Sequence, residues 1–250
     1  MDEIPVVILC GGQGMRLREL TETVPKPLVP VGEMTLVEHV MKIYAHQGFK
    51  RFVLLLGYKG PQIREYFLSD DFKRKNPEYR IDFVDTGEKT QTGGRIKMVE
   101  DSIESETFFV NYCDGLSDVD LKSLLEFHRK MGKIATLTGV HPMSRFGIIE
   151  VEGGIAKSFK EKPKMSGIVN GGYFVFNRKI FEYLDKDSVL EEEPLMRLSK
   201  EGQLAVFEHD GFWLCMDTYK EYEMLNDIWN GGKTGPTRVK FSKPPWKIWE

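Results

Sequence analysis

Long apolar runs, a large net charge and an even set of cysteines are all missing from this chain of 250 residues. No stretch approaches the roughly twenty apolar residues of a membrane-spanning helix, and no basic-then-apolar leader opens the chain, so neither a membrane span nor a secretory signal is expected. The formal net charge of −3 argues against binding nucleic acid through bulk electrostatics. Three cysteines, Cys10, Cys113 and Cys215, sit in apolar segments, which favours small core residues in a reducing, cytoplasmic compartment over disulfides.

Several familiar metal and nucleotide signatures are absent too. The five histidines never fall at metal-ligand spacing such as H-x-x-x-H. The glycines of "CGGQGMRL" lack the four-residue gap and the Lys-Ser or Lys-Thr pair of a P-loop. Counted from Gly12, Leu17 stands where the dinucleotide fingerprint requires its third glycine, which makes a Rossmann dehydrogenase a distant alternative.

What the opening segment does contain favours an anion site at the end of a strand. Residues 4–9 form an apolar run without alternation, which is typical of a buried strand. The glycines that follow can adopt unusual backbone angles and expose N–H groups that favour anions. Arg16 follows closely, and Lys26 lies between two prolines that predict extended backbone on both sides. A tight turn without a ligand is the plainer alternative.

The order of the predicted elements indicates an α/β fold. Strand-like and helix-like segments alternate up to about residue 140, which predicts a Rossmann-like three-layer core whose mixed sheet is mostly parallel. Asp118 is the expected N-cap of the helix at 118–132. Further along, "FGIIEVEGGIAKSFKEKP" reads as a β-hairpin, and 178–186 reads as a helix. The basic, Pro-rich and aromatic tail at 233–250 is expected to be an arm packed on this subunit or a neighbouring one.

Polar residues gather where these strands should end, and ligands of open parallel sheets bind beyond the carboxyl ends of strands. Asp114 and Asp217 come from different strands without a His or Cys ligand set, which suits Mg²⁺. Taken alone, the first could be a turn residue and the second a helix cap. Arg16 and Lys26 add positive charge near the glycine loop, while Lys162 suggests a second phosphate. The set fits phosphoryl or nucleotidyl transfer by positioning and charge neutralisation.

The motifs then resemble a known family. "GGQGMRL…PKPL", "YCDG", "EKP", "NGGYFVF" and "MDT" occur in the order and spacing of the sugar-phosphate nucleotidyltransferases. "VDTGEKTQTGGRIK", "RFGIIEV", "FEHDGFW" and "PPWKIWE" resemble the glucose-1-phosphate cytidylyltransferases within that family. The resemblance runs nearly end to end. It implies one domain at 1–232, with a nucleotide-binding half at about 1–140 and an acceptor-binding half with sugar-binding hairpin insertions at about 141–232, followed by a C-terminal arm at 233–250.

The resemblance implies a reaction and a set of roles. CTP and a sugar 1-phosphate would give a CDP-sugar and pyrophosphate through in-line attack on the α-phosphate, with Mg²⁺ held by Asp114 and Asp217. The implied catalytic residues are Arg16, Lys26, Asp114, Lys162 and Asp217. The nucleotide side would comprise Leu9, Gly11, Gly12, Gly14, Met15, Arg16, Lys26, Thr92, Gly93, Arg95, Tyr112 and Asp114, and the acceptor side Glu161, Lys162, Asn170 and Gly171. A homo-oligomer is also expected, in part because two tryptophans in the C-terminal arm need apolar partners.

The chain departs from the family pattern at a few positions. Met15 stands where the family usually has Thr, and Cys113 stands where Gly is common. The segment before "VDTG" is short, and "SVLEEEPL" lacks the Trp associated with that position. Two alternatives therefore stay open beside a cytidylyltransferase for a hexose 1-phosphate. One keeps the chemistry with another phosphorylated acceptor or another nucleoside triphosphate, and the other is a nucleotide-binding regulatory subunit without turnover.

Overall fold

The computed structural model describes residues 3–234 and 239–250, and its centre is a seven-stranded mixed sheet. The strand order is β12-β8-β11-β6-β1-β4-β5, and β11 alone in this sheet runs antiparallel to its neighbours. The predicted α/β fold with a mostly parallel, mixed sheet is therefore confirmed. The strands are β1 (Val6–Leu9), β4 (Arg51–Leu56), β5 (Arg80–Asp85), β6 (Thr107–Asn111), β8 (Ala135–Val140), β11 (Val169–Asn177) and β12 (Leu204–His209).

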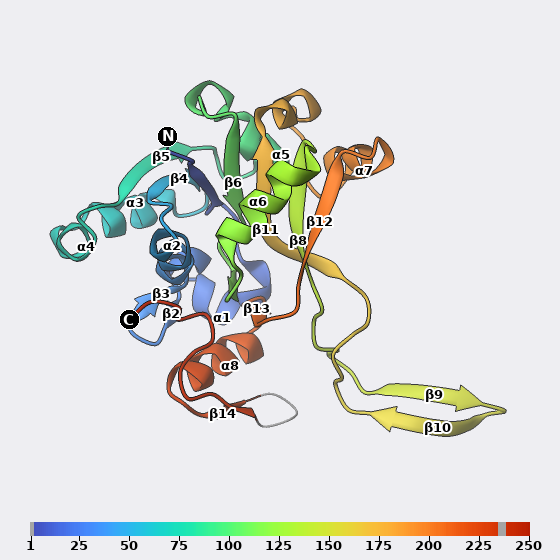
Figure 1. Cartoon of the computed structure of the whole chain (residues 1–250). Helices are drawn as coiled ribbons and strands as arrows, with labels where there is room; N and C mark the ends of the chain where they lie inside the picture. The colour runs from blue at the N-terminus through green and yellow to red at the C-terminus, as the bar shows by residue number, and fades with distance from the viewer. Residues whose placement is uncertain (1–2, 235–238) are drawn as a thin grey trace.

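Helices cover both faces of this sheet, as its uninterrupted apolar strands require. Alternate residues of β1 enter two separate apolar clusters, with Val6 and Ile8 in one and Val7 and Leu9 in the other. The first face is covered by α2 (Leu36–His46), α3 (Gly60–Leu68), α6 (Leu121–Met131) and α8 (Tyr219–Trp229), and the second by α5 (Thr92–Lys97), η4 (Arg178–Tyr183) and α7 (Glu193–Lys200). The three layers can be followed in Figure 1.

Short elements complete the chain. Two brief helices, α1 (Arg18–Thr21) and α4 (Asp70–Lys75), and three single-turn 3-10 helices, η1 (Met15–Leu17), η2 (Lys26–Leu28) and η3 (Glu100–Ser102), lie in the connections. The small strands pair as β2 (Pro30–Val31) with β3 (Met34–Thr35), β7 (Gly115–Ser117) with β13 (Trp213–Cys215), and β14 (Lys233–Thr234) with β15 (Val239–Lys240). None of the helices in the described ranges is long and apolar enough to cross a membrane.

Local hydrogen bonding overturns three details of the sequence prediction. Asp120, not Asp118, caps α6, because its carboxylate accepts from the N–H groups of Lys122 and Ser123 at 3.0 Å. Asp118 instead accepts from the N–H of Phe212 at 2.8 Å, which ties the loop before α6 to the chain before β13. The helix predicted at 178–186 is only the 3-10 element η4, and extended backbone follows it. Lys26 does not lie in extended backbone but begins η2.

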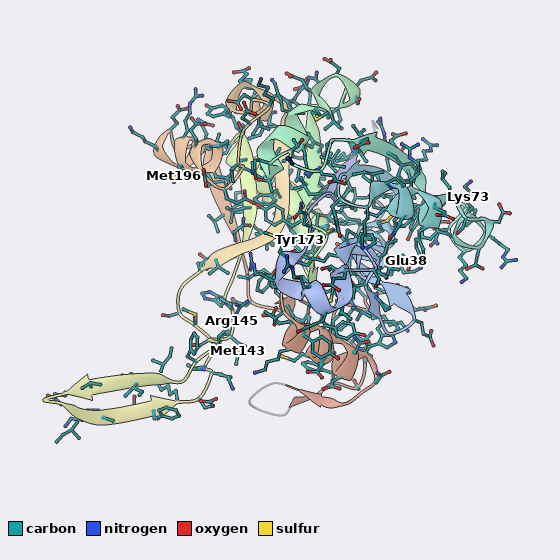
Figure 2. The ribbon with its side chains drawn as sticks, turned by 180° about the vertical axis from the view of Figure 1, so that it is seen from behind. Glu38, Lys73, Met143, Arg145, Tyr173 and Met196 are labelled. Carbon is teal, nitrogen blue, oxygen red and sulfur yellow. The ribbon has the colours of Figure 1, made fainter. Side chains whose placement is uncertain are left out.

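A two-stranded hairpin, β9 (Ile148–Glu152) and β10 (Ile155–Lys160), projects away from the rest of the molecule (Figures 1 and 2). Its turn uses two glycines with positive φ, at positions 153 and 154. One face carries Ile149, Val151 and Phe159, each more than half exposed. The other face carries the ion pairs Lys160–Glu150 and Lys157–Glu152. The predicted hairpin is thus present, and we call it the hairpin arm.

The end of the chain packs on its own core. Trp246 is fully buried, and its indole N–H donates to Nδ1 of His39 at 3.2 Å. Its ring also lies 5.4 Å from that of Phe212. Of the two expected partners of this arm, its own subunit or a neighbouring one, Trp246 therefore packs on its own.

Candidate active site

Four of the predicted catalytic side chains meet at one edge of the sheet. The ammonium of Lys26 lies 2.8 Å from a carboxylate oxygen of Asp114 and 3.1 Å from one of Asp217. The guanidinium of Arg16 lies 2.8 Å from the other oxygen of Asp217. These residues come from η2, from the turn after β6, from the turn after β13 and from η1. Separations of 88 to 201 residues in sequence thus become direct contacts.

The backbone around this cluster is held in place by short-range contacts. Cys113 takes a φ of 66°, which is uncommon outside glycine, and its N–H donates to the side-chain oxygen of Asn111 at 2.8 Å. Asp217 precedes α8, where its N–H and that of Thr218 both donate to Glu221, at 2.7 and 2.8 Å. Thr218 and Glu221 form the capping box of α8, so Asp217 is not the helix cap and its carboxylate is free to face Lys26.

The charges of the cluster support one another. Burial alone would lower the pKa of Lys26, but the carboxylates of Asp114 and Asp217 outweigh it and hold that pKa above its ordinary value. Burial would raise the pKa of Asp217, but Lys26, Arg16 and Arg145 hold it below its ordinary value. Lys26 and Asp217 are therefore both charged near neutral pH, as a site for polyanionic substrates requires.

The pair of carboxylates suits a hard divalent ion in its donor chemistry. Asp114 and Asp217 supply only oxygen ligands, and both approach a single ammonium, so one cation can be served by the two together. Within the described ranges no group of three or more Asp, Glu, His or Cys side chains gathers to hold a metal ion. Such a two-carboxylate set is typical of Mg²⁺ sites that keep several waters and also contact substrate phosphates.

The three glycines of the loop after β1 lie in three different structural settings. A Cβ on Gly11 would collide with the guanidinium of Arg95, so the absence of a side chain at this buried glycine makes room for Arg95. Gly14 takes a φ of 63° at the start of η1. Gly12 is exposed, and a Cβ there would meet nothing within 4 Å. Gly12 is thus the point of this loop that a ligand can approach.

The remaining residues predicted for the nucleotide side lie at different depths. Leu9 is almost fully buried, Met15 is 67% exposed, and Arg95 is buried. Thr92 and Gly93 pack on the segment after η4: the hydroxyl of Thr92 donates to Glu191 at 2.7 Å, and a Cβ on Gly93 would clash with Ser188. Both therefore make direct contacts with the protein itself.

On the acceptor side, part of the predicted set is tied into the core. The amide of Asn170 donates to the hydroxyl of Tyr112 at 3.3 Å and accepts from the N–H of Gly172 at 2.9 Å. The carbonyl of Gly171 accepts from the indole of Trp213 at 2.8 Å. These contacts bring the start of β11 to the residue that follows β6 and to the first residue of β13.

Glu161 and Lys162 lie apart, at the base of the hairpin arm just after β10. Their side chains pair with each other at 2.8 Å, and neither is among the hydrogen-bond partners of the Lys26 cluster within the described residues. Lys162 takes a φ of 44°, a conformation that non-glycine residues adopt at a cost. The structure therefore brings together Arg16, Lys26, Asp114 and Asp217, but not Glu161 and Lys162.

Two residues of the site escaped the sequence analysis. The guanidinium of Arg145 lies 3.0 Å from Glu221 and so joins the base of the hairpin arm to α8 (Figure 2). Glu221 in turn holds the backbone of Asp217. The T-x-x-E spacing of "TYKE" is a capping-box signal that could have identified Glu221, whereas Arg145 has no motif around it.

A separate cavity of about 630 Å³ lies at the opposite edge of the sheet, where β8 begins and β11 ends. Its lining includes Arg129, Lys133 and Lys179 but none of the predicted catalytic residues. The candidate site thus rests on its charge cluster and not on the size of a cavity.

Known proteins with similar sequences share one enzyme family. Residues 5–222 match the Nucleotidyl transferase family. The probable glucose-1-phosphate cytidylyltransferase of Bacillus subtilis is 43% identical over 97% of this chain and 99% of its own length. The glucose-1-phosphate cytidylyltransferase of Salmonella typhi is 40% identical over 98% of this chain and 99% of its own length.

Solved structures agree on the fold. HddC from Yersinia pseudotuberculosis superposes with a TM-score of 0.71 at 25% identity, covering 90% of this chain and 98% of that one. A UDP-glucose pyrophosphorylase gives a TM-score of 0.70 at 18% identity, which supports the fold alone. Since the family match spans most of the chain and the sequence relatives span nearly all of it, the chain belongs to the nucleotidyl transferase family.

Proposed function

We propose that this protein transfers a cytidylyl group from CTP to glucose 1-phosphate, giving CDP-glucose and pyrophosphate. The observation that carries the proposal is the ammonium of Lys26 shared by Asp114 and Asp217, with Arg16 on the second carboxylate. This arrangement holds two positive groups and two metal-binding carboxylates within one cluster. The substrates are proposed by similarity to glucose-1-phosphate cytidylyltransferases that are 40–43% identical over almost the whole chain.

The chemistry needs charge and position, with no nucleophilic side chain. An oxygen of the sugar phosphate attacks the α-phosphorus of the nucleotide, the bond to the β-phosphate oxygen breaks, and pyrophosphate leaves. Lys26 and Arg16 bind the triphosphate and neutralise the charge that grows on the departing pyrophosphate. Asp114 and Asp217 would hold Mg²⁺, which supplies charge neutralisation on the phosphate oxygens when bound.

The acceptor is proposed to bind between the start of β11 and the base of the hairpin arm. Asn170 and Gly171 line this region from β11, and Lys162 would grip the phosphate while Glu161 contacts the sugar hydroxyls. The left-handed backbone at Lys162 supports a functional constraint there, since such strain usually persists where the site requires it. In this proposal the base of the arm moves toward the Lys26 cluster when the acceptor binds.

The test is a substrate panel. CTP, UTP, ATP, GTP and dTTP are each supplied with glucose 1-phosphate and with other phosphorylated acceptors, and pyrophosphate release is measured with Mg²⁺ present. The proposal expects CTP with glucose 1-phosphate to give the highest kcat/KM. A higher kcat/KM for another pair would replace the substrates, and nucleotide binding without pyrophosphate release from any pair would favour the regulatory subunit.

The homo-oligomer also stays a prediction, and the hairpin arm supports it. A two-stranded hairpin is marginal by itself, and Ile149, Val151 and Phe159 form an apolar face that the described part of its own chain leaves open. Val151→Lys should lower the mass measured in solution, whereas Ser158→Lys on the charged face should not.

The cytoplasmic location is proposed from the three free cysteines, because disulfides are rare in that reducing compartment.

A further inference from the structure

The guanidinium of Arg95 lies beneath the nucleotide side of the site, where three neighbouring strands end. It donates to the carbonyl of Leu56, the last residue of β4, at 3.1 Å, and, just after β5, to the hydroxyl of Thr86 (2.5 Å) and the carbonyl of Gly87 (2.8 Å). It also donates to the carbonyl of Gly11, after β1, at 3.1 Å and to that of Glu88 at 3.3 Å. One side chain therefore ties together the loops that follow β1, β4 and β5.

Two glycines make room for this contact. A Cβ on Gly11 or on Gly57 would collide with the same nitrogen of the Arg95 guanidinium. The "TGG" before Arg95 seats its short helix, since Gly93 and Gly94 lie against the backbone of Ser188 and Lys186. The sequence analysis placed the "TGGR" motif on the nucleotide side. In the structure this motif positions the Arg95 guanidinium so that it donates to backbone carbonyls.

Holding these carbonyls has a consequence on the other side of each peptide unit. In a trans peptide the C=O and the following N–H point in opposite directions. With the carbonyls of Gly11, Gly87 and Glu88 turned toward Arg95, the N–H groups of Gly12, Glu88 and Lys89 turn away from it. Across residues 3–234 and 239–250 no protein acceptor is found for these three N–H groups. Gly12 is also the exposed, open point of the first loop.

We infer that Arg95 is a positioning residue that does not touch the nucleotide but fixes the three loops so that their outward N–H groups bind it. This inference rests on the proposed function. Convergent backbone N–H groups favour anions, and a guanidinium can serve several acceptors at once because its donors are held in a rigid fork. No carboxylate lies within 4 Å of Arg95 in the described part of the chain, so its hydrogen bonds go to backbone and to Thr86.

The experiment separates geometry from charge. Arg95→Lys keeps the charge but cannot serve five acceptors, so it should raise the dissociation constant of CTP about tenfold, the effect of losing one hydrogen bond to the ligand, while the KM of glucose 1-phosphate stays within about threefold. Arg64→Lys is the matched control, because Arg64 also donates to a β5 carbonyl but on the exposed side. Guanidinium chloride at non-denaturing concentration should restore CTP binding to Arg95→Ala.

Thr86→Val provides the second variant. Thr86 is buried and cannot reach a nucleotide, yet its hydroxyl accepts from Arg95, so its loss should weaken CTP binding by a smaller factor. CTP binding by Arg95→Lys at the wild-type affinity would overturn the inference. A large loss in Arg95→Lys beside unchanged binding in Thr86→Val would overturn it as well, because it points to direct contact. If the wild-type protein binds no CTP, the proposed function fails instead, and the same comparison is made with the nucleotide that it binds.

Discussion

Replacing Lys26 with methionine tests the centre of the site, because the variant keeps the length of the side chain and removes its charge. The ammonium lies 2.8 Å from Asp114 and 3.1 Å from Asp217, and only 13% of the side chain is exposed. At an effective dielectric constant of about 20, each attraction amounts to about 5–6 kcal/mol, most of which offsets the desolvation of the charges. The variant should therefore lose on the order of 2 kcal/mol of unfolding free energy in the absence of metal.

Magnesium should reverse part of this loss. In the wild-type protein the ammonium occupies both carboxylates, so a divalent ion would have to compete with it. In Lys26→Met the shared ammonium is gone and Arg16 remains on Asp217 alone, which leaves more negative charge to attract Mg²⁺. Added Mg²⁺ should raise the melting temperature of the variant more than that of the wild type. Turnover at saturating substrates should still fall about a hundredfold or more, because charge on the leaving pyrophosphate is no longer neutralised by Lys26.

The assay combines thermal unfolding with and without Mg²⁺ and pyrophosphate release at saturating CTP and glucose 1-phosphate. Lys97→Met is the matched control, since Lys97 is also partly buried and pairs with Glu100 at 2.6 Å, outside the cluster. The control should keep its kcat and show no added response to Mg²⁺. The reasoning is refuted if Lys26→Met keeps its kcat within about threefold of wild type, or if Mg²⁺ stabilises it no more than wild type.

Three further outcomes are expected. Asp217→Asn should lower kcat about a hundredfold while the protein stays folded, and wild-type kcat of this variant in the presence of Mg²⁺ would contradict the role of Asp217. Burial lowers the pKa of His39 to about 4, so the neutral ring contributes unfolding free energy above pH 6.5 that is lost as the pH falls toward 4, about 3 kcal/mol in all; His39→Gln should flatten this part of the melting-temperature profile, and an unchanged profile would contradict it. Trp246→Ala should cost about 3 kcal/mol or more of unfolding free energy, because the ring is fully buried in the protein's own core, and an unchanged urea midpoint would refute that packing.

The charge cluster could be predicted because it follows from a rule about sheets. Asp114 comes directly after an apolar strand, and Asp217 follows another, so both were expected at the carboxyl edge where ligands bind. The pairing of Lys26 with both carboxylates could not be predicted in this detail, because it depends on the single 3-10 turn of η2. The two flanking prolines predict extended backbone for Lys26, whereas in the structure Lys26 is the first residue of η2.

The contacts of Arg95 could not be predicted from the sequence for a similar reason. Its position depends on β1, β4 and β5 being neighbours in the sheet, and on a short glycine-containing helix that shows no clear periodicity. The steric reason for a glycine at position 11 likewise depends on the neighbouring guanidinium, which the sequence does not reveal. The N-cap of α6 was missed by two residues because Asp118 and Asp120 are chemically equivalent candidates, and only the hydrogen bonds distinguish them.

The position of the hairpin arm relative to the rest of the protein also could not be predicted from the sequence. "IIEVEGGIAKSFK" predicts a hairpin from its glycine turn and its strand propensity, but nothing in its pattern says which surface it covers. The family resemblance placed Glu161 and Lys162 in the site, whereas the structure has them paired with each other at the base of the arm. Their role in acceptor binding stays a prediction.

The most direct test of the account is the identity of the products formed from CTP and glucose 1-phosphate. Phosphorus NMR of a reaction with Mg²⁺ should show CDP-glucose and pyrophosphate appearing in equal amounts with the wild-type protein, and this conversion should slow about a hundredfold with Lys26→Met. Hydrolysis of CTP without CDP-glucose, or conversion by Lys26→Met at the wild-type rate, would contradict the assignment of this cluster as a nucleotidyl transfer site.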